Sequence, residues 1–253
     1  MFNCLIISAM IRRIHVSEVR VGDVALDPST GHHVRNVLRL RDAEPVEAFD
    51  DAGAIADGIL LLDSSPVVRV RIQTVRPSTR AALELIVAAA IPKGERADWM
   101  VEKLSELGAA TFIPLAAAHS IVLPEGKNKY ERWVRIATES AGQSRRPGVM
   151  RIASLMTVNT LLQSCSASST WYFSTAAHAP PVYEAIAHLL AAPPPATLTL
   201  LIGPEGGWSD GEIEQFTARQ LTAVHLTNTI LRIETAAIAA AAVIASILVP
   251  QLK

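Results

Sequence analysis

Hydrophobic and polar residues alternate in short stretches over the first part of the chain, and longer apolar runs replace this pattern after residue 80. Alternation with a period of two is typical of half-buried strands. It predicts strands at residues 24–26, 45–49, 54–62 and 67–72. Turn residues such as Asp51-Ala52-Gly53 separate these strands, and a helix is expected over residues 31–40. Residues 10–76 are therefore predicted to form a small β-barrel or sandwich.

From residue 81 onward, apolar strands alternate with helices. The strands are expected at residues 83–90, 111–115, 170–175, 198–202 and 223–226. The helices are expected at residues 96–107, 129–141, 182–190, 209–219 and 234–248, the first two ending at Gly108 and Gly142. This alternation is typical of an α/β domain with a mostly parallel sheet. We expect that domain over residues 81–253, joined to the first by a linker at residues 76–80.

The composition allows a sizeable core, because 50% of the residues are hydrophobic and 19% are charged, with a net charge of −1. The two cysteines, Cys4 and Cys165, form neither a disulfide framework nor a zinc pattern, which fits a reducing cytoplasm and no bound metal. The apolar run at residues 236–250 is shorter than the roughly 20 residues of a membrane span, so we expect a core helix and no membrane partner. Residues 1–9 lack the basic region of a signal peptide and are expected to be an extension ahead of Met10.

One glycine-rich segment stands out as a binding site, namely Leu201-Ile202-Gly203-Pro204-Glu205-Gly206-Gly207. It follows a strand and precedes a helix, the place where α/β proteins usually bind ligands. Its spacing matches neither the dinucleotide fingerprint nor the P-loop. Ser209 and Glu212 form a predicted capping box that would hold the segment rigidly. The alternative is that these glycines and the proline only mark a turn.

A second motif, Leu231-Arg232-Ile233-Glu234-Thr235, follows downstream, and three further segments accompany the pair. They are His33-Val34-x-Asn36-Val37-Leu38-Arg39, Lys93-Gly94-Glu95-Arg96 and Glu102-Lys103-x-x-Glu106-Leu107-Gly108. In this combination and order the chain resembles the ribosomal small-subunit RNA methyltransferase E family of the SPOUT superfamily. The resemblance implies an enzyme that uses S-adenosylmethionine to methylate N3 of a uridine in 16S ribosomal RNA or the small ribosomal subunit. It also implies an N-terminal PUA-like β-barrel, a C-terminal domain with a trefoil knot, and a homodimer.

The resemblance assigns two groups of residues to the site. The cofactor would lie against Leu201, Ile202, Gly203, Pro204, Glu205, Gly206, Gly207, Leu226, Thr227, Ile230 and Leu231. Arg232 would contact the developing uracil anion or a phosphate, and Glu234 would act as a base or hold Arg232. The alternative for these two charged residues is a structural ion pair.

Basic residues gather near the start of the chain and again between residues 127 and 151. Those expected to contact RNA phosphates are Arg12, Arg13, Arg35, Arg39, Arg145 and Arg146. The alternative is that they form a solvated surface.

The chain departs from the family pattern at four positions. Glycine is common at the position of Thr227, arginine at His119 and Gln143, and glutamine at Ser140. These differences bear on the width of the pocket and on contacts with RNA or a partner subunit. Two other functions therefore stay open, a knotted methyltransferase with a different RNA target and a catalytically silent RNA-binding homologue. Binding of S-adenosylmethionine separates the second from the enzymes.

Overall fold

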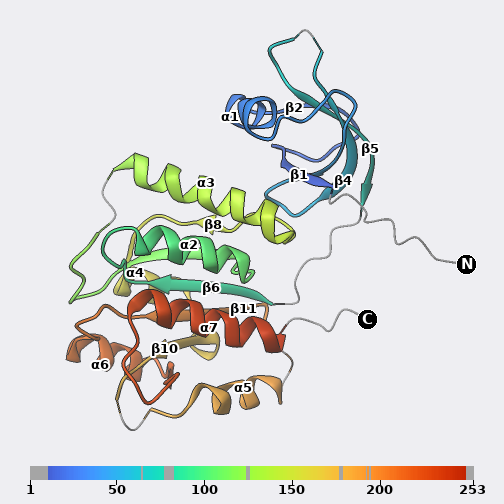
Figure 1. Ribbon diagram of the computed structural model, residues 1–253. Helices are drawn as coiled ribbons and strands as arrows, with labels where there is room; N and C mark the ends of the chain where they lie inside the picture. Colours follow the sequence, from blue (N-terminus) through green and yellow to red (C-terminus); the bar gives the residue numbers. More distant parts are fainter. Residues whose placement is uncertain are drawn as a thin grey trace, which may run out of the picture. The chain divides into compact units, whose positions relative to one another are not determined.

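The computed structural model describes residues 11–63, 65–76, 83–123, 126–176, 179–191, 193 and 195–248, which fall into two compact units (Figure 1). The first unit contains Met1–Arg80 together with Ala141–Val149, and the second contains Ala81–Ser140 and Met150–Lys253. The grouping of residues 141–149 with the N-terminal part was not foreseen. The expectation for residues 1–9 concerns residues outside the described part of the chain.

The first unit contains one five-stranded sheet in the order β1-β3-β4-β5-β2. Its strands are β1 (Arg12–His15), β2 (Gly22–Ala25), β3 (Pro45–Phe49), β4 (Ile55–Leu61) and β5 (Arg69–Arg76). β1 pairs with β3 in parallel, and the other pairings are antiparallel. The expected helix is a short helix α1 (Pro28–His32) followed by a π-helical turn η1 (His33–Val37), so it begins and ends earlier than predicted. It begins early because Asp27 accepts hydrogen bonds from the backbone N–H groups of Ser29 and Thr30.

The alternation along these strands buries one face of the sheet. Val46, Leu60 and Val70 are fully buried and belong to one hydrophobic cluster with Val34 of the π-helical turn. This core explains why β2, β3, β4 and β5 could be predicted from period-two patterning, although β1 was not among the predicted strands.

Within the first unit, polar contacts bind residues 141–149 to the N-terminal part of the chain. Arg13 Nη1 donates hydrogen bonds to the carbonyl oxygens of Ala141 and Arg146, at 3.2 and 3.0 Å. The Arg13 side chain is only 2% exposed, and its Nε lies 2.6 Å from a carboxylate oxygen of Glu47. Gly148 has a φ of +73°, and a Cβ there would lie 2.9 Å from the carbonyl oxygen of Asp51, so only glycine fits.

The second unit is built on a seven-stranded sheet in the order β12-β10-β11-β6-β7-β8, with β9 also paired to β7. The strands are β6 (Glu84–Ala89), β7 (Thr111–Ala116), β8 (Arg151–Ile152), β9 (Met156–Thr157), β10 (Thr170–Phe173), β11 (Thr197–Ile202) and β12 (Thr222–Val224). Neighbouring strands of this sheet pair in parallel. The prediction of an α/β fold with a mostly parallel sheet is therefore confirmed.

Helices cover this sheet on two sides. They are α2 (Arg96–Glu106), α3 (Lys127–Ser144), α4 (Val158–Ser164), α5 (Val182–Leu190), α6 (Asp210–Ala218) and α7 (Ile233–Leu248), with the short turn η2 (Ala167–Ser169). α7 lies beside α2 and packs on β6 and β11, as Figure 1 shows. α4 and α6 contribute to a separate hydrophobic cluster with β7, β10 and β11. No helix in the described ranges has the length and apolar character needed to cross a membrane.

The predicted end of α3 at Gly142 is wrong, because the helix continues to Ser144. The chain leaves the helix at Arg145, whose φ of +58° is left-handed. Gly142 instead packs against the Phe49 ring, where a Cβ would lie 3.7 Å from the ring carbons. The prediction for Gly108 is confirmed, since it directly follows the helix end at Leu107 with a φ of +85°.

Replacing Arg13 by methionine is expected to lower the free energy of unfolding of the protein by about 2 to 3 kcal/mol. The change leaves two backbone carbonyl groups without their donor and takes one cation from Glu47. Urea unfolding measures the difference. Arg12→Met on the neighbouring, exposed side chain is the control, and an equal loss in both variants would contradict the structural role of Arg13.

Candidate functional site

A pocket of about 740 Å³ opens at the carboxyl ends of β10, β11 and β12 in the second unit. Small-molecule sites in proteins have volumes of this order. The three strand ends are level, because Tyr172 pairs with Leu201 and Phe173 pairs with Val224. The pocket is lined by residues 173–176, 202–208 and 225–231, together with Ile213, Ile233 and Ala236. Three loops that are far apart in the sequence therefore form one site.

The glycine-rich loop packs closely against the indole ring of Trp208. A Cβ on Gly203 would lie 2.9 Å from the Trp208 indole, so a larger residue would displace the ring. The indole Nε1 donates to the carbonyl oxygen of Phe173 at 2.9 Å, and the ring meets Phe216 edge-on at 5.1 Å. Gly207 has a φ of +75°, which side chains rarely adopt. The glycines thus have packing reasons that a simple turn would not require.

The side chain of Glu212 holds the end of this loop by hydrogen bonds. The predicted capping box is confirmed: Glu212 Oε2 accepts from the N–H and hydroxyl of Ser209, and Ser209 Oγ accepts from the N–H of Glu212. The other carboxylate oxygen accepts from the backbone N–H of Ala118 at 2.9 Å. Glu212 is only 7% exposed, so its charge is desolvated but fully hydrogen-bonded. One side chain therefore joins the loop after β7 to the loop after β11, a link that the sequence pattern did not reveal.

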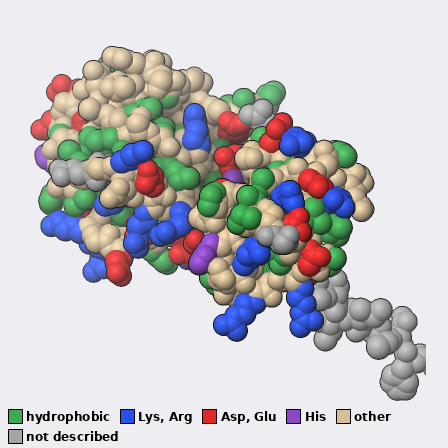
Figure 2. Space-filling model, turned by 90° about the horizontal axis from the view of Figure 1, so that it is seen from above, with side chains coloured by type: hydrophobic (Ala, Val, Ile, Leu, Met, Phe, Trp, Pro, Cys, Tyr) green, Lys and Arg blue, Asp and Glu red, His purple; other side chains and the backbone are tan. Residues whose placement is uncertain are grey.

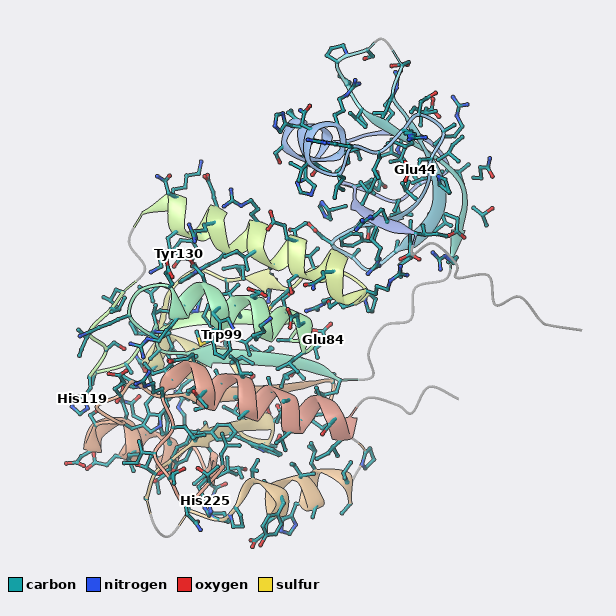
Figure 3. All side chains as sticks on the ribbon, viewed as in Figure 1. Glu44, Glu84, Trp99, His119, Tyr130 and His225 are labelled. Carbon is teal, nitrogen blue, oxygen red and sulfur yellow. The ribbon has the colours of Figure 1, made fainter. Side chains whose placement is uncertain are left out.

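His119 makes a second contact between the same two loops. Its Nδ1 lies 3.2 Å from the carbonyl oxygen of Gly206 and 3.1 Å from that of Gly207. Carbonyl oxygens only accept hydrogen bonds, so Nδ1 carries the proton. Figure 3 shows His119 beyond the carboxyl end of β6. A Cβ on Gly206 would lie 3.0 Å from the His119 Cβ, which leaves little room for a side chain.

The residues predicted to bind a cofactor line the pocket, with the exception of Leu201. The Leu201 side chain is fully buried in the cluster that includes Tyr172 and Phe216, because alternate residues of a strand point to opposite faces. Thr227 does line the pocket, but its hydroxyl donates to the carbonyl oxygen of Thr229 at 2.8 Å and is thus held within its own turn. Binding of the cofactor by these residues stays a prediction.

Sequence reasoning missed the β10 wall of the pocket, residues 173–176, together with His225 and Asn228. His225 Nδ1 lies 2.6 Å from the carbonyl oxygen of Ala179, and its backbone N–H donates to Pro180. Figure 3 labels His225 on the segment that follows β12. The predicted strand at residues 170–175 was the available signal, since neighbouring parallel strands end at the same edge of a sheet.

The two predicted catalytic residues, Arg232 and Glu234, differ in burial and in their partners. Glu234 is 4% exposed, and its Oε1 lies 3.2 Å from Nη1 of Arg96. The hypothesis that Glu234 holds Arg232 is therefore wrong, because a buried carboxylate needs a nearby cation and Arg96 supplies it. Arg232 is exposed at the start of α7, where its carbonyl oxygen accepts from the N–H of Ala236.

The arginines predicted to contact RNA all belong to the first unit. The prediction for Arg13 is wrong, because its buried guanidinium is already engaged by Glu47 and two carbonyl groups. Arg146 is partly buried, and burial lowers the pKa of its guanidinium to about 10. Arg145 is exposed but donates to the carbonyl oxygen of Ile11. Arg12 and Arg39 are exposed, so they are the most accessible of the set.

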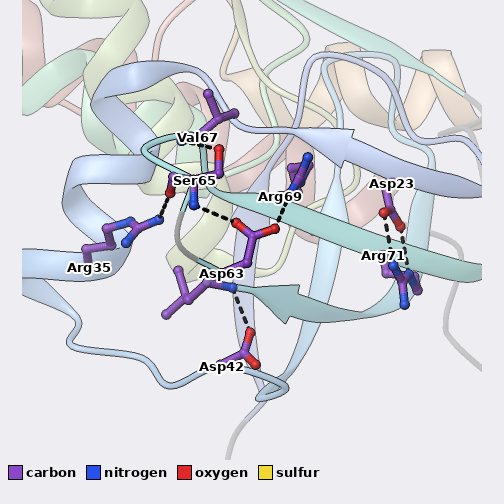
Figure 4. Close-up of polar contacts among 9 residues, drawn as sticks. Asp23, Arg35, Asp42, Asp63, Ser65, Val67, Arg69 and Arg71 are labelled. Atoms are coloured by element: carbon purple, nitrogen blue, oxygen red, sulfur yellow. Dashed lines mark hydrogen bonds and ion pairs between the residues drawn. The ribbon is translucent and has the colours of Figure 1, made fainter.

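Acidic side chains neutralise other arginines on the surface of the first unit. Figure 4 shows Asp63 pairing with Arg69. Arg35, one of the arginines predicted to contact RNA, instead donates to the backbone carbonyl oxygen of Ser65. Arg71 forms a bidentate pair with Asp23, which raises the pKa of Arg71 and lowers that of Asp23. In the view of Figure 2, basic and acidic side chains are interspersed. A phosphate-binding surface would therefore depend on a few exposed arginines.

Of the other positions that differ from the family pattern, Ser140 has a structural role. It is buried, and its hydroxyl donates to the carbonyl oxygen of Glu102 on α2 at 3.1 Å. Gln143 is exposed.

Known proteins resemble this chain in sequence and in structure. A family model for the RNA methyltransferase domain matches residues 79–245. The ribosomal RNA small subunit methyltransferase E of Bacillus subtilis (strain 168) is 30% identical over 211 residues, covering 81% of this chain and 82% of the relative. The protein of the same name from Synechocystis sp. is 31% identical over 227 residues, covering 89% of this chain and 73% of the relative.

The crystal structure of a ribosomal RNA small subunit methyltransferase E from Neisseria gonorrhoeae bound to S-adenosyl methionine is similar in fold. It matches with a TM-score of 0.82 and 26% identity, covering 93% of this chain and 97% of that chain.

Replacing Glu212 by glutamine is expected to lower the free energy of unfolding by about 1 to 3 kcal/mol. A glutamine side chain has one carbonyl oxygen, so it cannot accept from both Ala118 and Ser209. Thermal or urea unfolding measures the loss. Glu214→Gln, an exposed position on the same helix, removes the same charge and is expected to change stability little. Equal effects of the two variants would show that only net charge matters.

Proposed function

Because the chain belongs to the ribosomal RNA small subunit methyltransferase E family, we propose that it transfers a methyl group from S-adenosylmethionine to N3 of a uridine in 16S ribosomal RNA. The observation that carries this proposal is the pocket itself. Its walls come from the glycine-rich loop and from residues 225–231, which lead into the second motif. The two sequence motifs thus meet in space around one cavity of suitable size.

The residues of the pocket fit S-adenosylmethionine chemically. Loop residues 203–207 offer backbone N–H and C=O groups without side chains at three glycine positions, so a ligand can approach closely. Leu226, Ile230 and Leu231 provide apolar surface for an adenine ring. When bound, the cofactor supplies an electrophilic methyl group on a sulfonium.

The protein's own task is to orient the target base and stabilise its charge. N3 of uridine carries a proton that must be lost before the nitrogen attacks, and the base must leave its stack or be single-stranded. Holding N3 in line with the methyl group supplies much of the rate increase. Arg232 is exposed and directly follows the pocket residue Leu231, so its guanidinium can stabilise the developing uracil anion. Because Glu234 is buried against Arg96, we assign it no proton transfer.

The finer features of the family extend this proposal. The first domain, residues 10–76, would be a PUA-like RNA-binding barrel, which the five-stranded sheet and its accessible arginines Arg12 and Arg39 support. The second domain, residues 81–253, would contain the trefoil knot and pair with a second copy as a homodimer in the cytoplasm. The order of the strands and the three loops around the pocket support a SPOUT arrangement.

The decisive experiment incubates the purified protein with S-adenosylmethionine and either 16S RNA or assembled small subunits. Mass mapping then locates the modified nucleotide and the methylated atom. We expect one uridine to gain a methyl group on N3. Methylation of another nucleotide would favour the knotted methyltransferase with a different target. Failure to bind S-adenosylmethionine at millimolar concentration would favour the silent RNA-binding homologue.

Replacing Gly206 by valine is expected to weaken S-adenosylmethionine binding at least about tenfold, or 1.4 kcal/mol, while the protein stays folded. The added side chain would meet His119 and push the loop into the pocket. Calorimetry measures the affinity, and thermal unfolding verifies the fold. Gly211→Ala adds a Cβ where no atom lies within 4 Å, so this control is expected to bind normally. If the valine variant binds S-adenosylmethionine as tightly as the unchanged protein, the loop is only a turn and not part of the binding site.

Replacing Arg12 and Arg39 together by alanine is expected to weaken RNA binding and to flatten the slope of log affinity against log salt by about 1 to 2. Each exposed arginine would lose one phosphate contact. Filter binding at several salt concentrations gives the slope. Arg71→Ala is the matched control, because Asp23 already neutralises that guanidinium. An unchanged slope in the double variant would assign both arginines to a solvated surface.

A further inference from the structure

One guanidinium contacts the glycine-rich wall of the pocket and also the start of α7, which directly follows the opposite wall at residues 225–231. Arg96, the first residue of α2, places Nη1 at 3.2 Å from Oε1 of Glu234 and at 3.6 Å from Oε1 of Glu205. Its Nε also donates to the carbonyl oxygen of Lys93 at 3.3 Å. Glu205 belongs to the glycine-rich loop, and Glu234 lies in the first turn of α7, just after the wall at residues 225–231. Arg96 itself does not line the pocket.

The two contacts differ in strength. Glu234 is buried, and its Oε2 has no hydrogen-bond partner among the described residues, so the carboxylate depends on the Arg96 cation. The Glu205 side chain is 50% exposed and farther away, so solvent screens that pair. The ion pair of Arg96 with Glu234 on α7 is therefore stronger than its ion pair with Glu205 on the glycine-rich loop. Nη1 makes both carboxylate contacts, while Nε holds the planar guanidinium on the carbonyl oxygen of Lys93, a second anchor that the single ammonium group of lysine lacks.

We propose that Arg96 is a positioning residue that sets the separation of the two pocket walls and thereby the affinity for S-adenosylmethionine. The inference rests on the proposed function. Arg96 acts through Glu205 and Glu234 without touching the ligand. Its removal releases Glu205 and the start of α7 together, which loosens both walls.

The test compares S-adenosylmethionine binding by the full-length protein and its variants, using calorimetry together with KM and kcat for methylation of 16S RNA. Arg96→Met is expected to raise the Kd and the KM for S-adenosylmethionine about tenfold, with a smaller change in kcat. Arg96→Lys restores one ion pair and is expected to recover part of the affinity. Glu205→Gln is expected to have a smaller effect, and the double variant Arg96→Met with Glu205→Gln is expected to bind no worse than Arg96→Met alone.

Arg132→Met is the matched control. Arg132 pairs with Asp98 of the same helix α2 at 2.7 Å, but neither residue lines the pocket. Its loss is expected to leave the Kd unchanged. If Arg96→Met fails to fold because Glu234 is left unpaired, the double variant Arg96→Met with Glu234→Met removes both charges and takes its place, with the same expected rise in Kd.

The outcomes separate the two proposals. Normal S-adenosylmethionine binding by the unchanged protein and equally tight binding by Arg96→Met would overturn the role of Arg96 alone. Additive effects of Arg96→Met and Glu205→Gln would do the same, because they would show that the two residues act independently. Absence of binding by the unchanged protein would overturn the proposed function and the positioning role with it.

Discussion

The site depends on the hydrogen bonds that the buried carboxylate of Glu212 accepts from two loops. The carboxylate accepts hydrogen bonds from Ser209 on one side and from the backbone of Ala118 on the other. Because a desolvated charge is stable only when its lone pairs are satisfied, the loop after β7 and the loop after β11 must keep their relative positions. His119 adds a second contact between the same loops at Gly206 and Gly207. Protein contacts alone thus hold this wall of the pocket in place, which limits the entropy lost when a ligand binds.

Most of the charged side chains around the pocket that are discussed above bind other protein groups and so stabilise the structure, leaving few free to act on a substrate. Glu234, Glu212 and Arg96 are engaged with protein partners, and among the predicted catalytic residues only Arg232 remains exposed to meet a substrate. This division follows from burial, because a buried ion without a partner would be unstable. A similar division holds in the first unit, where Arg13 fastens residues 141–149 while Arg12, its neighbour on the same strand, faces solvent.

Much of the fold could be predicted because local patterns and packing agree. Period-two alternation located β3 and β4, and apolar runs located β6 and β11, since these strands bury one or both faces. β8 and β9 were missed because two residues cannot show a period, and α4 was missed because it spans only about two turns. The end of α3 was misplaced because Arg145, and not Gly142, adopts the left-handed conformation. The capped start of α6 was predicted because a capping box is a local interaction between residues three apart.

By itself, the sequence determined most of the strands and helices, the glycine-rich loop and its capped helix, and the family to which the chain belongs. These features depend on neighbouring residues or on motif order, so they can be read along the chain. The tertiary structure decided which charged groups are paired and which are exposed. It placed Arg96 on Glu234, Ala118 on Glu212 and Arg13 on the segment 141–149. Such pairs join residues far apart in the sequence, and their partners are fixed only when packing removes water from the charges.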